Sequence, residues 1–251
     1  MCGRYVADAS IDDLAAEFAA IADGSVLELM ASFNVAPTDR VPVVLERTDE
    51  PPERTRQLHA ARWGLIPSWA KDASGGAKMI NARIETVGEK PAFRGPVARR
   101  RCVVPASGYY EWQRGPGGSG RKQAFYIHPP GGAARLAMAG VFEWWRDDSV
   151  PAEDPARWVL SASVLTTTPA PELAHIHDRM PVFLTADTLG DWLDRGNEDA
   201  AGVLDLARSA AGSVGAGLVA RPVGPEVGNV RNNHPGLAEE YLPAQPDLLG
   251  S

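Results

Sequence analysis

The stretch RCVVPASGYYEWQ, residues 101–113, decides the fold of this chain. Its first half contains two adjacent valines and its second half is aromatic, and both residue types favour extended strands. The run Pro-Ala-Ser-Gly lies between the halves and predicts a turn. The stretch is therefore expected to form a strand, a turn and a second strand.

More strands are expected on both sides of this stretch. The pattern is clearest over 157–167, where Trp158, Leu160, Ala162 and Val164 recur at every second position. Further strands are predicted over 41–46, 55–64, 123–128, 134–145 and 217–223.

Helices are predicted to be few and short. Residues 10–22 place Ile11, Leu14 and Phe18 at helical spacing, and Ser10 is a candidate N-cap. Two more helices are expected over 187–195 and 198–209. Many short strands with few helices indicate an α+β fold built on antiparallel or mixed sheets.

Length and composition indicate one domain. The 251 residues, 44% of them hydrophobic, are enough for a single compact core, expected over 2–240 with a flexible tail over 241–251. The GPGGSG segment at 115–120 is a hairpin tip or a flexible insert. No run of 18 apolar residues predicts a membrane span, and the N-terminus lacks the apolar segment of a secretory signal. Two cysteines provide no disulfide framework and favour a reducing, cytoplasmic setting.

The formal net charge of −7 hides an uneven distribution of charge. Residues 54–122 contain 14 Lys and Arg against 4 Asp and Glu, a local charge of +10. Residues 123–251 contain 8 against 17, a local charge of −9. A middle third this basic is able to hold phosphates, and a solvated basic face is the simpler alternative.

The chain begins with MCGRY, so a cysteine directly follows the initiator methionine. Removal of Met1 would leave a free α-amine and a thiol on one residue, Cys2. These groups titrate near ~8 and ~8.5, so both are partly nucleophilic at neutral pH. The alternative is a chance cysteine at a frayed terminus.

Two residues are candidates for proton transfer. Glu111 lies in YYEW, where partial desolvation among aromatic neighbours would suit a carboxyl group to this role. The alternative is that Glu111 simply faces solvent. His177 lies in HIHD at the start of a predicted strand, a usual place for a catalytic imidazole, although a structural loop histidine is an alternative. No matching set of cysteines and histidines accompanies HIHD, so no zinc site is predicted.

The segment INAR supplies an amide and a guanidinium. Asn81 can orient a reacting carbonyl or amine, and Arg83 can bind a phosphate with two parallel hydrogen bonds. An Asx-turn is the alternative for the asparagine.

These segments, in their order along the chain, resemble a known family. MCGRY, FNVAPT (33–38), INARIET (80–86), SGYYEW (107–112), IHDRMP (176–181) and VGNVRN (227–232) resemble the SOS response-associated peptidases, also described as abasic-site processing proteins. The resemblance implies a single domain with a barrel-like core and flanking short helices. It implies no cofactor and no metal, and single-stranded DNA containing abasic sites as the partner. We expect a monomer that acts in the cytoplasm, associated with the nucleoid.

The family resemblance also assigns roles to residues of this chain. It implies that Cys2 is the nucleophile, that Asn81 lies beside its α-amine, and that Glu111 and His177 are the acid–base pair. The residues that it assigns to DNA are Arg4, Arg83, Thr166 and Arg179 on the phosphate backbone, and Pro37 and Trp69 against the bases. Trp63 is expected to pack in the core instead.

An N-terminal cysteine suits capture of an abasic site, whose open sugar carries an aldehyde. The amine would form a Schiff base and the neighbouring thiol would close a thiazolidine, aided by the high effective molarity of an intramolecular reaction. Met1 could be removed by the protein itself or by cellular trimming. Two rival hypotheses are an N-terminal-nucleophile amidohydrolase of the glutamine amidotransferase type and a non-catalytic DNA-binding module.

Overall fold

The computed structural model describes residues 2–47, 55–113, 122–132 and 134–241. Its strands are β1 (Arg4–Ala7), β2 (Ala20–Ala22), β3 (Ser32–Val35), β4 (Arg40–Arg47), β5 (Thr55–Trp63), β6 (Asn81–Arg83), β7 (Arg101–Ala106), β8 (Gly108–Gln113), β9 (Gln123–His128), β10 (Leu136–Arg146), β11 (Trp158–Thr167), β12 (Met180–Pro181), β13 (Phe183–Leu184) and β14 (Val219–Val223). Its α-helices are α1 (Ile11–Phe18), α2 (Arg94–Arg99), α3 (Ala186–Leu193) and α4 (Ala200–Ala216). The 115–120 segment and almost all of the predicted tail lie outside the described residues.

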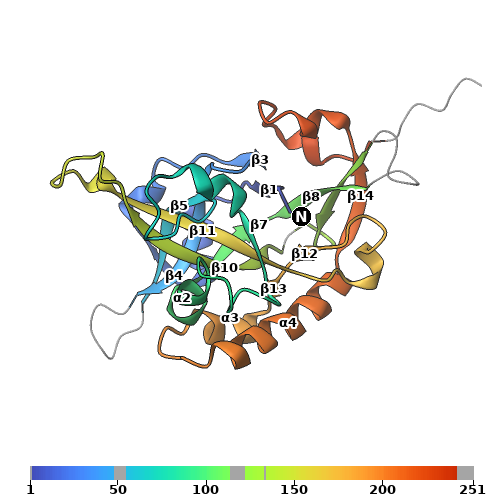
Figure 1. Cartoon of the computed structure of the whole chain (residues 1–251). Coiled ribbons are helices and arrows are strands. Elements are labelled where there is room, and N and C mark those ends of the chain that lie inside the picture. The colour runs from blue at the N-terminus through green and yellow to red at the C-terminus, as the bar shows by residue number, and fades with distance from the viewer. Residues whose placement is uncertain (1, 48–54, 114–121, 133, 242–251) are drawn as a thin grey trace, which may run out of the picture.

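The strands form two sheets, and the larger one closes on itself. In the larger sheet β11, β10, β7, β4 and β5 are neighbours in that order, and β11 also pairs with β5. This last, parallel pairing completes a barrel-like core. The smaller sheet has the order β14-β9-β8-β1-β3, and α2, α3 and α4 lie along the lower side of the barrel in Figure 1. The predicted α+β class with a barrel-like core is confirmed.

The stretch 101–113 forms the predicted strand, turn and strand, and it connects the two sheets. Strand β7 belongs to the barrel and β8 to the smaller sheet, so the chain leaves the barrel at Ser107. Gly108, the first residue of β8, lets the Tyr126 ring lie against the backbone, because a Cβ there would lie 2.5 Å from Cζ of Tyr126. The crossing places β8, with Glu111, beside β1 at the start of the chain.

Two helices differ from the sequence prediction. The helix expected over 10–22 ends at Phe18, because Ala19 adopts a left-handed φ of 48° and residues 20–22 pair with β5 as strand β2. Its predicted cap is confirmed, since the backbone N–H of Asp13 donates to Ser10 Oγ at 3.1 Å. Helix α4 continues to Ala216, beyond the expected 198–209, because its small residues Ala210, Ala211 and Gly215 are buried.

Three adjacent arginines of the basic middle third contact other parts of the protein, and one of them, Arg101, is buried. Arg101 is 1% exposed, and the five hydrogen bonds described for its guanidinium end on backbone carbonyls. The carbonyls belong to Val97, Ala98, Trp192, Asp194 and Asn197, at the C-terminal ends of α2 and α3 and in the loop that follows. Arg99 and Arg100 form ion pairs with Glu198 and Glu143. Burial and saturation by carbonyls leave Arg101 unavailable to a phosphate in this structure, whereas Arg99 stays exposed.

The helices give no sign of a membrane segment. None of those described combines the length and the apolar character that crossing a bilayer requires.

Candidate active site

Cys2 lies at the entrance to β1, which is flanked by β3 and β8 in the smaller sheet. The residue has no exposed surface. Burial raises the pKa of its thiol, and the negative charge of Glu111 raises it further. The thiol is therefore neutral at pH 7, and a reaction at its sulfur needs a group that accepts its proton.

Asn81 binds the backbone of Cys2. Strand β6 pairs in parallel with β11, which places Asn81 opposite Val164 at the C-terminal end of that strand. From there the Asn81 side-chain Nδ2 donates to the carbonyl oxygen of Cys2 at 2.6 Å. Asn81 Oδ1 is buried and accepts no hydrogen bond from the described part of the chain.

Trp63 contacts β1 and the start of β6 beside Cys2. Its indole N–H donates to the carbonyl of Ile80 at 3.0 Å, and its ring meets Tyr5 edge to face with the ring centroids 5.0 Å apart. The side chain has no exposed surface, so the expected core position of Trp63 is confirmed. Trp63 thus connects β1, which follows Cys2, to the segment that holds Asn81.

The candidate acid–base pair comes together from two distant segments. Glu111 on β8 is 4% exposed, so the solvent-facing alternative is wrong. Its Oε1 accepts the backbone N–H of Trp112 at 3.2 Å and lies 4.0 Å from Nε2 of His177. On the other side of the imidazole, Nδ1 lies 3.0 Å from the backbone nitrogen of Arg179 and 2.8 Å from a carboxylate oxygen of Asp178.

The arginines assigned to phosphates have different surroundings. Arg179 donates to both carboxylate oxygens of Glu85, at 2.9 and 2.8 Å, and its side chain is only 11% exposed. Arg4 donates to Asn34 Oδ1 and to the carbonyl of Val227, both at 3.0 Å. A phosphate would have to compete with these acceptors.

Arg83 is the most accessible of the three arginines. It is exposed, and the described residues provide no ion pair for its guanidinium. It lies on an open groove of about 390 Å³ that is also lined by Trp69, Lys90 and Phe93. Asn81, whose side chain binds the carbonyl of Cys2, also lines this groove. Lys90 and Phe93 were not singled out from the sequence, although both lie in the polar 79–94 segment that includes Asn81.

The remaining predicted DNA contacts, Pro37, Trp69 and Thr166, differ in how exposed they are. Trp69 is 68% exposed, as a residue that meets a base should be. Pro37 is half-buried in a turn whose next residue, Thr38, donates from its backbone to the carbonyl of Trp63 at 2.8 Å. Thr166 has no exposed surface, and its hydroxyl donates to the carbonyl of Ala82 at 3.4 Å, so it supports β6 and is out of reach of a phosphate in this structure.

The motifs 33–38 and 227–232 meet beside the start of the chain. Asn34 is buried, and its Nδ2 reaches the carbonyls of Val227, Asn229 and Asn232 at 3.3, 3.1 and 2.9 Å. Because Arg4 also contacts Asn34 and Val227, these two motifs fix the segment that follows Cys2.

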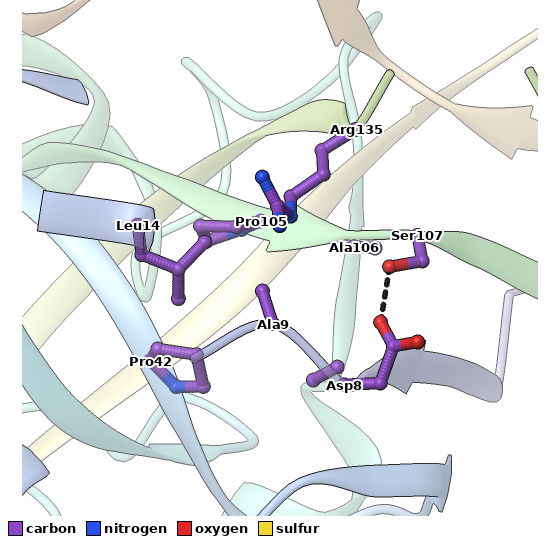
Figure 2. Close-up of a pocket in the computed structure, with 9 residues that line it drawn as sticks. Asp8, Ala9, Leu14, Pro42, Pro105, Ala106, Ser107 and Arg135 are labelled. Carbon is purple, nitrogen blue, oxygen red and sulfur yellow. Dashed lines mark hydrogen bonds between the residues drawn. The ribbon is translucent and has the colours of Figure 1, made fainter. Parts of the chain in front are cut away.

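Two further observations limit other sites. Figure 2 shows a hollow between Leu14, Pro42 and Arg135, near the hydrogen bond from Ser107 to Asp8. Its volume of about 10 Å³ has room for a single water and is too small for a substrate. Within the described ranges, no three His, Cys, Asp or Glu side chains gather as metal ligands would.

Comparison with known proteins points to one family. A family model described as "SOS response associated peptidase (SRAP)" matches residues 1–230. "Abasic site processing protein YoqW" of Bacillus subtilis is 34% identical over 243 residues, which cover 96% of this chain and 100% of that protein. "Abasic site processing protein HMCES" of Rattus norvegicus is 30% identical, covering 88% of this chain and 69% of that protein. A solved structure from Bacteroides thetaiotaomicron has the same fold, with a TM-score of 0.75, 23% identity and coverage of 96% and 100%.

Proposed function

The chain belongs to the SOS response-associated peptidase family, and we propose from this premise that it captures abasic sites in single-stranded DNA covalently through Cys2. One observation carries the proposal. The second residue of the chain is held by the Asn81 amide at 2.6 Å and is electrostatically coupled to Glu111, whose carboxylate faces His177. These contacts support the roles proposed here for Cys2 as nucleophile, for Asn81 as orienting amide, and for Glu111 and His177 as acid–base pair.

The reaction begins with removal of Met1, which frees the α-amine of Cys2. Trimming by the protein itself or by a cellular peptidase would serve equally. Cys2 is buried in the full-length chain, so the proposal requires that this removal open a path from the groove to the nitrogen. In this proposal Asn81 Oδ1, which accepts no hydrogen bond from the described residues, accepts one from the freed amine.

The abasic sugar must then open before it can react. His177 donates a proton to the ring oxygen as the bond between that oxygen and C1′ breaks, and Glu111 accepts the proton of the C1′ hydroxyl. An open-chain aldehyde results. General acid–base catalysis of this kind contributes ~10²–10⁴-fold to a rate.

Two bonds form between Cys2 and C1′. The amine adds to the aldehyde and, after Glu111 returns a proton to the departing hydroxyl, one water leaves and an iminium remains. The thiol then adds to the iminium carbon, and its proton passes to His177, which lost one when the sugar opened. The product is a five-membered thiazolidine, with one water released overall. Only a 1,2-aminothiol closes this ring within one residue, and intramolecular closure is strongly favoured.

The groove supplies the DNA contacts in this proposal. Arg83 and Lys90 are exposed cations for phosphates, and Trp69 is an exposed surface for stacking of an unpaired base. Such contacts carry little sequence information, which suits a lesion found in any sequence. We propose that the protein acts as a monomer, because each element named here belongs to one chain.

Intact mass tests the proposal directly. The intact mass of the purified protein is measured by mass spectrometry before and after incubation with single-stranded DNA that carries one abasic site. A matched strand with an intact base is the control. We expect a chain that begins at Cys2, and an adduct with the mass of protein plus DNA minus one water. Absence of an adduct from chain that begins at Cys2 would refute the proposal.

The same material separates the rival functions. An amidohydrolase would release ammonia from glutamine, and a non-catalytic module would bind DNA without an adduct that survives denaturing electrophoresis. Glu111→Gln is expected to slow adduct formation by about 10²-fold or more.

A further inference from the structure

The Nδ1 atom of His177 has two neighbours that require different protonation states. The backbone N–H of Arg179 lies 3.0 Å away and can donate only to an unprotonated Nδ1. A carboxylate oxygen of Asp178 lies 2.8 Å away and can only accept a hydrogen bond, which requires a protonated Nδ1. The two contacts therefore belong to two forms of the same imidazole.

The acid role of His177 needs the second form. When the Arg179 N–H occupies Nδ1, the neutral imidazole carries its one proton on Nε2, towards Glu111. Loss of that proton would leave an imidazolate, which is not accessible near neutral pH. An imidazolium avoids this problem, because it releases the Nε2 proton while the other proton stays on Nδ1 and is donated to Asp178 in a hydrogen bond.

We propose that Asp178 is a positioning residue that stabilises the acid form of His177 by accepting a hydrogen bond from the protonated Nδ1. Its carboxylate stabilises the imidazolium while Nε2 faces the reacting sugar. When Nε2 has regained a proton and Nδ1 has released its own to solvent, His177 is again the neutral Nε2–H form, and Nδ1 exchanges Asp178 for the backbone N–H of Arg179. This inference rests on the proposed function only for the identity of the proton acceptor, since the exchange at Nδ1 is a property of the protein alone.

Among the contacts described for His177 and its neighbours, the other charged groups do not duplicate this one. Glu111, on β8, faces the opposite nitrogen, Nε2. The Arg179 guanidinium is turned to Glu85 and to the carbonyl of Thr166, so only its backbone faces Nδ1. The ring of His175 packs edge-on against Phe125, with centroids 6.2 Å apart. Asp178 is 82% exposed and the His177 side chain 20% exposed, so the effect is that of a partly solvated ion pair.

The kinetic test uses the pH dependence of the crosslinking rate in Asp178→Asn. At pH 8 the variant is expected to be about threefold slower than the wild type, the size of a partly exposed ion pair. At pH 5.5 the two rates are expected to converge, because an imidazole is then protonated in both proteins. Asp178→Glu should restore the rate at pH 8 to within about twofold. Asp205→Asn, which removes a surface carboxylate on α4, controls for net charge and should match the wild type.

Other rate patterns would overturn the inference. An equal loss at both pH values would indicate a structural or DNA-binding role for Asp178, and no loss at pH 8 would show that its carboxylate is not needed.

A second measurement needs no DNA. Two-bond ¹H–¹⁵N spectra of the labelled protein report which ring nitrogen carries a proton, and His177→Gln identifies the resonances. We expect His177 Nδ1 to gain its proton at a pH about half a unit lower in Asp178→Asn than in the wild type. Identical transitions would overturn the inference even if crosslinking is observed. A displaced transition in a protein that fails to crosslink would support the inference and refute the proposed function.

Discussion

Replacing Arg101 with methionine tests whether the basic segment serves the fold or the DNA. Methionine keeps the apolar stem of the side chain and removes all of its donors. Arg101 lies between Arg99 and Cys102 in the most basic part of the chain, so sequence alone makes it a candidate for phosphate binding. The structure instead buries its guanidinium among carbonyls at the ends of α2 and α3.

The magnitude of the effect follows from those carbonyls. The bonds to Trp192 and Val97 are buried, at 2.6 and 3.0 Å, so each acceptor loses its partner without gaining water. A buried acceptor left unsatisfied costs about 1–3 kcal/mol. The three other carbonyls are only partly buried and can recover part of their bonding from solvent. The expected loss in the free energy of unfolding is about 4 kcal/mol, a large share of the ~5–15 kcal/mol typical of a domain.

Thermal and urea denaturation measure this loss. For a domain of this size, about 4 kcal/mol lowers the melting temperature by roughly 10 °C. The matched control is Arg99→Met, whose ion pair with Glu198 joins side chains that are 65% and 70% exposed. That variant should stay within about 0.5 kcal/mol of the wild type. An Arg101→Met protein no less stable than Arg99→Met would refute the reasoning. An Arg101→Met protein with wild-type stability and weakened DNA binding would refute it as well.

Three further predictions concern the site and its groove. Cys2→Ala keeps the amine and loses the sulfur, so crosslinks should survive denaturing electrophoresis only after borohydride reduction; a stable adduct without hydride would contradict the thiazolidine. Arg83→Ala should weaken binding of single-stranded DNA and reduce the slope of log K against log salt by about 0.7, measured by fluorescence anisotropy, because one phosphate contact is lost; an unchanged slope would exclude that contact. Burial raises the pKa of the Cys2 and Cys102 thiols, so above pH ~8.5 the unfolded chain releases protons that the folded chain retains. Stability should therefore fall as the pH rises, by about 2 kcal/mol per thiol at pH 10, and Cys102→Ala should show a smaller loss of melting temperature between pH 7 and pH 10 than the wild type does.

The strands and the identity of the chemical groups could be predicted from the sequence. Alternation and aromatic content are local properties, and they identified 101–113 and 157–167 as strands that the structure contains. The order of short motifs also predicted the family, to which the chain belongs. The end of α1 was missed because the apolar pattern continues past Phe18, whereas pairing of residues 20–22 with β5 ends the helix.

What the arginines do could be learned only from the tertiary structure. Arg83, Arg101 and Arg179 carry the same charge, yet one faces the groove, one holds helix ends and one binds Glu85. A guanidinium has a long, flexible stem, so its position in the sequence leaves its partner undetermined. The nearest acceptors come from segments that are distant in the chain, as with Arg179 and Glu85, 94 residues apart.

The site itself shows the same division between sequence and structure. Residue type determined which groups can act as nucleophile, amide and acid–base pair, because that chemistry is intrinsic to each side chain. Their meeting depends on β1 pairing with β8, on β6 pairing with β11, and on a loop that brings His177 within 4.0 Å of Glu111. Those pairings are set by which hydrophobic faces are buried together across the whole chain, and local sequence patterns carry no information about that choice.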